Sequence, residues 1–236
     1  MYFQHSDRIW AEFPQLAAGV LYADGISPDA RVESLVAEHV MAARSRLGSG
    51  TEAELPEVQA WRRAFAQMGF KPTQYRCASE ALLRRFRKDG SIPRVHPVVD
   101  LCNAVSLATA VPVAVLDVAN IAGDLEVRHA SGDESYLTFA GAQEHPDADE
   151  VIFADGARQA HARRWVNRQS GLSAARATTT EVLVVVEALH QSAARDVEAL
   201  ITMLGEELVT AGSTVRANAV LSRSSPRFSF ERRSSS

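Results

Sequence analysis

The sequence predicts an α+β fold, with a mixed β-sheet packed by helices, and three observations support this prediction. Amphipathic stretches with helical spacing dominate the front third of the 236 residues. From about residue 112, short apolar and β-branched runs alternate with Gly and Asp turns, which is typical of strands. Helical spacing returns at 193–211. A chain of this length can form one large domain or two small ones.

The elements of the front half follow from turn and cap residues. An apolar strand at 16–26 closes at Asp24-Gly25, and Ser27-Pro28-Asp29 then provides a helix start. Glycines at the ends of the amphipathic stretches predict where the helices stop. Pro97 suits the first turn of a helix. The expected helices cover 29–48, 56–68, 79–88 and 97–109.

The second half reads as strands and one long helix. Strands are expected at 112–117, 125–130, 135–139, 151–154, 161–168 and 180–189. The helix at 193–211 has an apolar face, made of Val197, Leu200, Ile201, Leu204 and Leu208. We expect 1–64 to be a helical and strand part of the same domain and 65–211 to be its main body. Residues 212–236 are rich in Ser and Arg, so a disordered tail is expected there.

Composition narrows the class of protein. A hydrophobic fraction of 46% and a charged fraction of 23% are typical of an ordinary soluble protein. No apolar run reaches the roughly 18 residues of a membrane span, so no membrane partner is expected. Cys77 and Cys102 lie far apart, which indicates a reducing, cytoplasmic setting. A net charge of −4 argues weakly against a general nucleic-acid binder. The sequence indicates no oligomeric state.

The common catalytic and cofactor motifs are absent, so no cofactor is expected. The sequence has no nucleophile elbow, P-loop, dinucleotide fingerprint or H-E-x-x-H, and its seven histidines have no metal-ligand spacing. Asp100 and Asn103 share a face of a predicted helix, where they either bind backbone or face a ligand. Asp117 ends a strand, where a cap is as good an interpretation as a catalyst. Glu80 and Arg84 have the spacing of a solvated helix pair.

The stretch "HARRWVNRQS", residues 161–170, holds three arginines and one tryptophan without a carboxylate. As an alternating strand it would send Arg164 and Arg168 to one face and Trp165 and Asn167 to the other. Trp165 and Asn167 would then form an aromatic floor beside an amide, suited to an amino acid, a base or a ribose. Residues 71–94 carry seven basic and two acidic side chains, and together the arginines could form a rim for phosphates.

Several ordered motifs resemble one known family. They are "FAQMGFKPTQYRCASEALLRR", "VVDLCNAVSLATAVPVAVLD", "GDLEVRHA", "VIFADG", "RRWVNRQS" and "TTTEVLVVVEAL". Together they resemble a free-standing B3/B4 (B3/4) domain, the editing domain of the phenylalanyl-tRNA synthetase β subunit. The resemblance runs from about Phe65 to Glu187. It implies the B3/B4 fold and a trans-editing hydrolase that removes the amino acid from mischarged tRNA, with the tRNA acceptor end and the aminoacyl group as partners.

The chain also departs from the family motifs. Ala114 stands where the synthetase has a histidine, and "RRWVNRQS" lacks the glutamate that reads the wrong side chain. The recognition of tyrosine therefore cannot be transferred from the synthetase. The threonine run matches better, so Thr178, Thr179 or Thr180 is expected to border the pocket, with a purely local role of Thr178-x-x-Glu181 as the alternative.

An aminoacyl ester is already activated, so positioning a water and stabilising an oxyanion can suffice for hydrolysis. We expect the catalytic groups among Asn103, Asp117 and Thr179, with Asp117, Glu134 or Asp155 as the alternatives for a general base. The expected substrate-binding residues are Arg164, Trp165, Asn167, Arg168, Arg84 and Glu80. Two other functions stay open: a tRNA- or RNA-binding module without catalysis, and a binder or hydrolase of a small amino-acid derivative.

Overall fold

A computed structural model describes residues 1–48 and 50–232. Six α-helices and two short 3-10 helices are present in this part of the chain. They are α1 (Asp7–Glu12), α2 (Glu33–Leu47), η1 (Glu52–Glu54), α3 (Pro56–Gln67), α4 (Ala78–Asp89), α5 (Pro97–Thr109), η2 (Val118–Asn120) and α6 (Ala193–Thr210). Within the described residues, no helix is both long and apolar enough to cross a membrane.

Among the described residues the strands form three sheets, of which only the six-stranded one contains a parallel pair. A six-stranded sheet has the order β12-β1-β4-β7-β8-β9, a four-stranded sheet has the order β11-β2-β10-β3, and β5 pairs with β6 alone. The strands are β1 (Tyr2–His5), β2 (Ala17–Asp24), β3 (Val113–Asp117), β4 (Leu125–His129), β5 (Tyr136–Leu137), β6 (Gln143–Glu144), β7 (Val151–Asp155), β8 (Ala160–Arg163), β9 (Arg168–Gln169), β10 (Glu181–Ala188), β11 (Thr214–Leu221) and β12 (Arg227–Ser229). The predicted α+β fold is confirmed.

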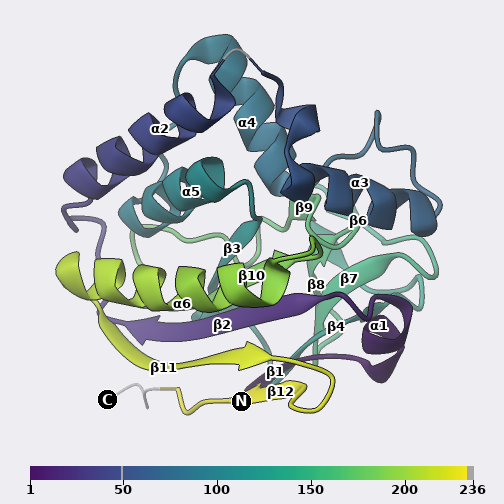
Figure 1. Cartoon of the computed structure of the whole chain (residues 1–236). Helices are drawn as coiled ribbons and strands as arrows, with labels where there is room; N and C mark the ends of the chain where they lie inside the picture. Colours follow the sequence, from purple (N-terminus) through teal and green to yellow (C-terminus); the bar gives the residue numbers. More distant parts are fainter. Residues whose placement is uncertain (49, 233–236) are drawn as a thin grey trace.

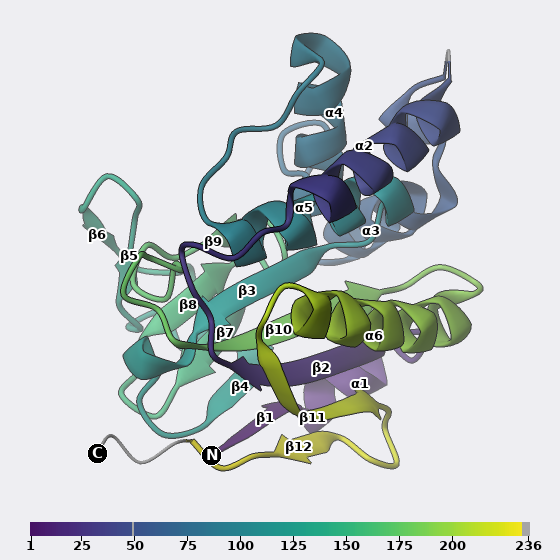
Figure 2. The same cartoon turned by 90° about the vertical axis from the view of Figure 1, so that its left-hand side faces the viewer.

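The four-stranded sheet lies between the helices and the six-stranded sheet. Helix α6 runs along one face of this sheet, and α2, α4 and α5 lie on the same side (Figures 1 and 2). Helix α3 instead packs Trp61 and Phe65 into the core that the two sheets share. The strands β1, β4 and β12 lie on the opposite side (Figure 2). The central sheet is therefore covered on both faces, which agrees with the burial of all of β2 and of β10 after Glu181.

Alternation along β10 divides its side chains between two cores. Val182, Val184 and Val186 pack with the helices, while Leu183 and Val185 pack toward the six-stranded sheet. Since side chains alternate along a strand, Glu187 belongs to the second set. A carboxylate is thus placed in the layer between the two sheets.

One glycine allows α6 to lie directly on β2. A Cβ at Gly19 would lie 2.2 Å from Cγ1 of Ile201 and 2.8 Å from Cγ1 of Val197. Distances this short require backbone or side-chain shifts, so a side chain at this position would push the helix off the sheet.

The expectation of a disordered tail at 212–236 is wrong for most of its length. Residues 214–221 form β11, which pairs with β2, and residues 227–229 form β12, which pairs with β1. Alternating burial explains β11: Ala217, Ala219 and Leu221 pack against the core, and Asn218 and Val220 between them face outward. The Ser- and Arg-rich composition does not show this alternation, so it predicted disorder instead of strands. Residues 233–236 of the expected tail lie outside the described residues.

Two boundaries and one additional strand also differ from expectation. The second helix begins at Glu33 instead of residue 29, because Ser27 holds a turn in which its Oγ accepts from the amide of Asp29 at 3.1 Å. The strand expected at 135–139 is only Tyr136–Leu137. Residues 2–5 form an additional strand, which pairs in parallel with β4.

Candidate functional site

The stretch expected as one strand at 161–168 is a hairpin. β8 ends at Arg163, four residues turn, and β9 begins at Arg168. Arg164 and Trp165 in the turn have φ angles of 48° and 57°, in the left-handed region that non-glycine residues seldom adopt. The expected division of the stretch into two alternating faces is therefore wrong, because the turn redirects its side chains.

The arginines of this hairpin have carboxylate partners from distant positions. The Arg163 guanidinium is buried and donates to both oxygens of Glu150, at 2.9 and 2.8 Å, and to Glu144 at 2.8 Å. The backbone amide of Arg164 donates to Glu150 at 2.9 Å. Arg168 is the most exposed of the three and lies 3.3 Å from Glu144. The ion pairs of Arg163 and Arg168 with these glutamates therefore stabilise the turn.

A small cavity opens beside this turn. The cavity has a volume of about 60 Å³, counted as the space that the centre of a water molecule can occupy. One water needs roughly 10–15 Å³ on this measure, so several waters or a small chemical group fit. Its walls are mainly apolar, and the lining residues are Ala78, Pro112, Val113, Ala114, Leu116, Phe153, Ala162, Trp165, Val166, Asn167, Arg168, Gln169, Val185 and Glu187.

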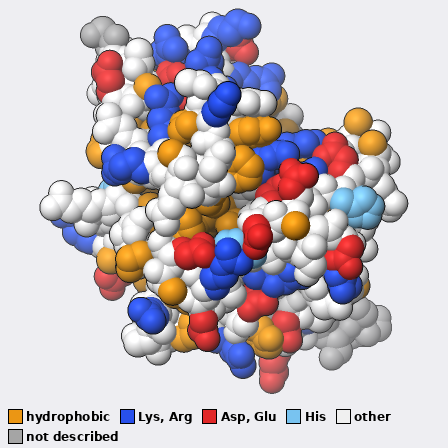
Figure 3. Space-filling model, turned by 90° about the vertical axis from the view of Figure 1, so that its right-hand side faces the viewer, with side chains coloured by type: hydrophobic (Ala, Val, Ile, Leu, Met, Phe, Trp, Pro, Cys, Tyr) orange, Lys and Arg blue, Asp and Glu red, His pale blue; other side chains and the backbone are white. Residues whose placement is uncertain are grey.

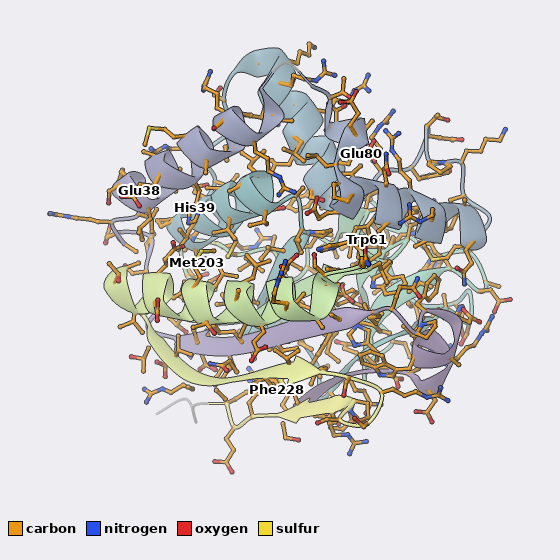
Figure 4. The ribbon with its side chains drawn as sticks, in the orientation of Figure 1. Glu38, His39, Trp61, Glu80, Met203 and Phe228 are labelled. Atoms are coloured by element: carbon orange, nitrogen blue, oxygen red, sulfur yellow. The ribbon has the colours of Figure 1, made fainter. Side chains whose placement is uncertain are left out.

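Trp165 forms a rigid part of this lining. Its ring is fully buried and packs edge-to-face on Phe13 at 4.9 Å and on Trp61 at 5.1 Å between centroids. Trp61 lies on the inner side of α3, toward the sheet (Figure 4). Trp165 was expected in the pocket as part of a strand. It lines the cavity, but the turn and the aromatic contacts hold it there.

Glu187 is the only carboxylate among the described residues that line the cavity. It is 1% exposed, and its Oε1 accepts from Nε1 of Trp165 at 2.8 Å and from Nε2 of His5 at 2.6 Å. Because a carboxylate only accepts, Nε2 of His5 carries the proton. Within the described residues, no donor is bonded to Oε2 of Glu187. The cavity is thus bordered by a buried carboxylate with one free acceptor oxygen.

Two amides add further acceptors. Asn167 donates its Nδ2 to the carbonyl of Arg76 at 2.7 Å, and Gln169 donates its Nε2 to the carbonyl of Val115 at 2.6 Å. A carbonyl can only accept, so these bonds fix the orientation of both amides and leave their oxygens as acceptors. The cavity therefore suits a group that donates hydrogen bonds, such as an ammonium or a water.

One known protein family matches the part of the chain that forms the cavity. The family model of the B3/4 domain matches residues 60–203, which include every residue that lines the cavity. The chain belongs to the B3/4 domain family. The resemblance predicted from the sequence motifs is thereby confirmed.

Two individual proteins are similar to this chain. The phenylalanine–tRNA ligase β subunit of Shewanella oneidensis is 31% identical over 74 residues, which are 31% of this chain and 9% of the ligase subunit. An N-terminal fragment of the phenylalanyl-tRNA synthetase β subunit from Pyrococcus horikoshii is 9% identical, with a TM-score of 0.46, over 91% of this chain and 50% of that chain. The B3/4 chain spans only a small part of the curated ligase subunit that it matches.

Asp117 and Thr179, two of the expected catalytic residues, meet away from the cavity lining. Thr179 donates its hydroxyl to Oδ2 of Asp117 at 2.7 Å, and Oδ1 of Asp117 accepts from the amide of Ala119 at 3.0 Å. The Thr179 oxygen also accepts from the amide of Arg176 at 2.8 Å. Both side chains are buried and bonded, so they join β3, η2 and the loop before β10. This contact fits a structural role.

The remaining expected residues lie apart from the cavity lining. Asn103 on α5 is half-buried and makes no side-chain hydrogen bond within the described residues. Glu80 is fully buried where α4 faces α3 (Figure 4), and it binds Arg62 at 2.5 Å and Arg76 at 3.4 Å. The expected pair of Glu80 with Arg84 is wrong, because the exposed Arg84 points toward Glu52 at 4.0 Å. Which of these residues touch a ligand stays a prediction.

The alternative general bases are strongly hydrogen-bonded. Burial alone would raise the pKa of Glu134, but bonds from the Ser131 amide and from Arg128 lower it to about 2. In Asp155, bonds from His161 and from the amides of Ala122 and Gln159 likewise overcome burial and lower the pKa. Carboxyl groups held in the ionised form this firmly are poor proton acceptors.

Sequence reasoning missed His5 and Glu187. One signal for Glu187 was present, since it is the only charged residue in the apolar run "VLVVVEALH", and a charge in such a run needs a partner. No spacing could connect His5 to it across 182 positions. Among the described residues, no group of three His, Cys, Asp or Glu side chains could hold a metal ion.

Proposed function

We propose that this B3/4 domain binds the acceptor end of tRNA and hydrolyses the ester of a mischarged aminoacyl-tRNA. The observation that carries the proposal is the cavity within the family match, lined by Glu187, whose Oε2 accepts no hydrogen bond among the described residues. The similarity of 74 residues to a phenylalanine–tRNA ligase β subunit supports an RNA substrate. Because the match covers 9% of that subunit, the ligase activity itself is not transferred.

The acceptor groups of the cavity fit the aminoacyl end. An aminoacyl ester carries an α-ammonium group, which needs acceptors, and Asn167 and Gln169 keep acceptor oxygens. The apolar walls then accommodate the side chain, and their limited volume excludes larger ones. Arg168 lines the cavity with an exposed guanidinium that pairs with Glu144 at 3.3 Å, and in this proposal it exchanges that contact for a phosphate of the RNA.

Glu187 has the position for general base catalysis. In the proposed step its carboxylate accepts a proton from a water whose oxygen attacks the ester carbonyl carbon. The ribose oxygen leaves with that proton, which gives the free amino acid and the uncharged RNA. Trp165 and His5 hold the other carboxylate oxygen, so the free oxygen keeps a fixed direction.

The test is deacylation of a panel of correctly and wrongly charged tRNAs by the whole chain. Selective release of one mischarged species, lost in Asn167→Ala and kept in Arg223→Ala, is the expected result. Arg223 is a suitable control because it is exposed between β11 and β12, outside the cavity lining.

Two other results would replace the proposal. Binding of tRNA without release above the spontaneous rate would make the domain a binding module. Release of the amino acid from a small ester, insensitive to salt and to added tRNA, would assign it to small amino-acid derivatives, since binding to phosphates weakens steeply with salt.

A further inference from the structure

The cavity beside the hairpin turn is closed at one end and open at the other. Ala78 and Arg168 are exposed, and Asn167 and Gln169 are half-buried, so the cavity opens on their side. The deepest lining residues, each at most 1% exposed, are Leu116, Phe153, Trp165, Val185 and Glu187. We call these five residues the floor. A ligand that fills the cavity enters past Arg168 and ends at the floor.

The general base of the proposed function belongs to the floor. A carboxylate takes a proton from a water only within hydrogen-bond reach, about 2.6–3.2 Å between oxygens. That water in turn must lie about 3–3.5 Å from the ester carbonyl carbon that it attacks. An ester held at the open end cannot meet both conditions, because Glu187 is 1% exposed. The aminoacyl group must therefore enter the closed end, together with the water.

The closed end leaves little room for a side chain. The volume of about 60 Å³ holds roughly four to six water-sized groups, because each needs roughly 10–15 Å³. The water, the ester carbonyl, the α-carbon and the ammonium occupy most of this space. A benzene ring, in comparison, fills an apolar cavity of about 150 Å³. The remaining space therefore fits a side chain of at most about two non-hydrogen atoms and excludes an aromatic ring.

The walls of the floor are held by their own packing. The ring of Phe153 lies 5.9 Å from that of Phe3, measured between centroids, behind the cavity. Val185 on β10 stands directly opposite Ala114 on β3, and both line the cavity. Side chains opposite each other on neighbouring antiparallel strands have Cβ atoms about 4.5–5.5 Å apart, so this pair fixes the width of one wall. Close-packed walls do not move aside for a larger group without cost.

Charge on the surface does not choose between amino acids. On the face drawn in Figure 3, Lys and Arg side chains gather in the upper part, the end of the molecule where α4 lies in Figure 1. Such cations bind phosphates, which are the same in every tRNA and carry no information about the attached amino acid. Selection between amino acids therefore depends on the walls of the cavity.

We propose that the cavity selects aminoacyl groups with small side chains, those of glycine, alanine, serine and cysteine, and that Val185 and Ala114 set the size limit. This inference rests on the proposed function, because the ester must reach Glu187. It adds the class of amino acid that is removed and the two residues that exclude the others.

The experiment charges one tRNA in turn with glycine, alanine, serine, valine and phenylalanine, and measures single-turnover release by the whole chain. Using one tRNA keeps the phosphate contacts constant. Alanine is expected to leave at least about 10-fold faster than valine, because one methylene in a fitted pocket changes the rate by roughly 10–200-fold. Phenylalanine should leave at the spontaneous rate.

A pair of variants on β10 tests the size limit. Val185→Ala removes two methyl groups from the floor, so release of valine relative to alanine should rise by about 10-fold. Val184→Ala is the matched control, because Val184 is the next residue of the same strand and is fully buried in the core on the helix side, outside the cavity lining. Both truncations leave a hole in a core, so a difference between them reports the cavity and not the stability of the fold.

A third variant narrows the cavity without leaving a hole. Ala114→Val adds two methyl groups at a half-buried position of β3, and a β-branched residue suits a strand. Release of alanine relative to glycine should fall by about 10-fold. Release of phenylalanine as fast as alanine, or equal ratios in Val185→Ala and Val184→Ala, would overturn the inference.

Binding of small amides separates this inference from the hydrolase. Alaninamide and phenylalaninamide carry the ammonium and the side chain without a reactive ester, and Trp165 in the lining provides a fluorescence signal. Tighter binding of alaninamide that Val185→Ala reduces, without deacylation of any charged tRNA, supports the size selection and removes the hydrolase. Deacylation with equal binding of both amides supports the hydrolase and removes the size selection.

Discussion

Asp117 and Glu187 are both buried carboxylates on adjacent strands of the central sheet, yet their surroundings differ. Asp117 accepts one hydrogen bond at each oxygen, from Ala119 and from Thr179. Glu187 receives two bonds at Oε1, while no donor among the described residues binds Oε2. Asp117 joins chain segments, and Glu187 borders a cavity. The comparison teaches that unused hydrogen-bonding capacity distinguishes a candidate site better than residue type does.

The largest expected effect is on catalysis. Glu187→Gln keeps an acceptor for Trp165 and His5 but cannot accept a proton, so deacylation should fall by about 10²–10⁴-fold. Asp117→Asn should leave the rate per folded molecule unchanged. The measurement is single-turnover release of the amino acid by both variants. Equal losses in the two variants would contradict the distinction between the two carboxylates.

The second largest effect is expected on the free energy of unfolding. It comes from Glu134, a carboxylate that accepts hydrogen bonds at both oxygens, as Asp117 does. Its pKa of about 2 lies below the ordinary value of 4.5, so its contribution to stability is present above pH 4.5 and is lost as the pH falls toward 2. The contribution is about 3 kcal/mol by linkage. Denaturant unfolding of the parent and of Glu134→Gln should therefore differ most near neutral pH and converge near pH 2. A constant difference across this range would show that the carboxylate charge is not responsible.

A smaller effect is expected when Asp117 loses one donor. Thr179→Val keeps the shape of the side chain but leaves Oδ2 of Asp117 buried without its hydrogen bond, which should cost about 2 kcal/mol of unfolding free energy. Deacylation per folded molecule should stay unchanged. Chemical denaturation together with a rate measurement checks both parts. A lost rate with full stability would return Thr179 to the catalytic residues.

Much of the fold follows from local patterns. The helices at 56–68, 79–88, 97–109 and 193–211 were expected within two residues of α3, α4, α5 and α6, because their apolar spacing and terminal Gly or Pro residues act locally. The hairpin at 164–167 could not be predicted in this way. Its left-handed turn at Arg164 and Trp165 is held by Glu150, Trp61 and other partners far away in the sequence.

The site was only partly accessible from the sequence. Trp165, Asn167 and Arg168 were expected to bind substrate, and all three line the cavity. Glu187 and His5 were not expected, because their roles arise from the stacking of two sheets. Arg163 was expected to contribute to a rim for phosphates, but it is buried between Glu144 and Glu150. Local sequence shows which residue types are present, and only the topology decides which charges neutralise one another.

The bond between His5 and Glu187 also bears on how the molecule assembles. It joins residues 182 positions apart, and β1 that carries His5 is held between β4 and β12. Contacts between such distant residues close long loops and are slow to form. The cavity is therefore expected to be completed late in folding, after the helices. A growing chain on the ribosome cannot complete its site until β10 has emerged.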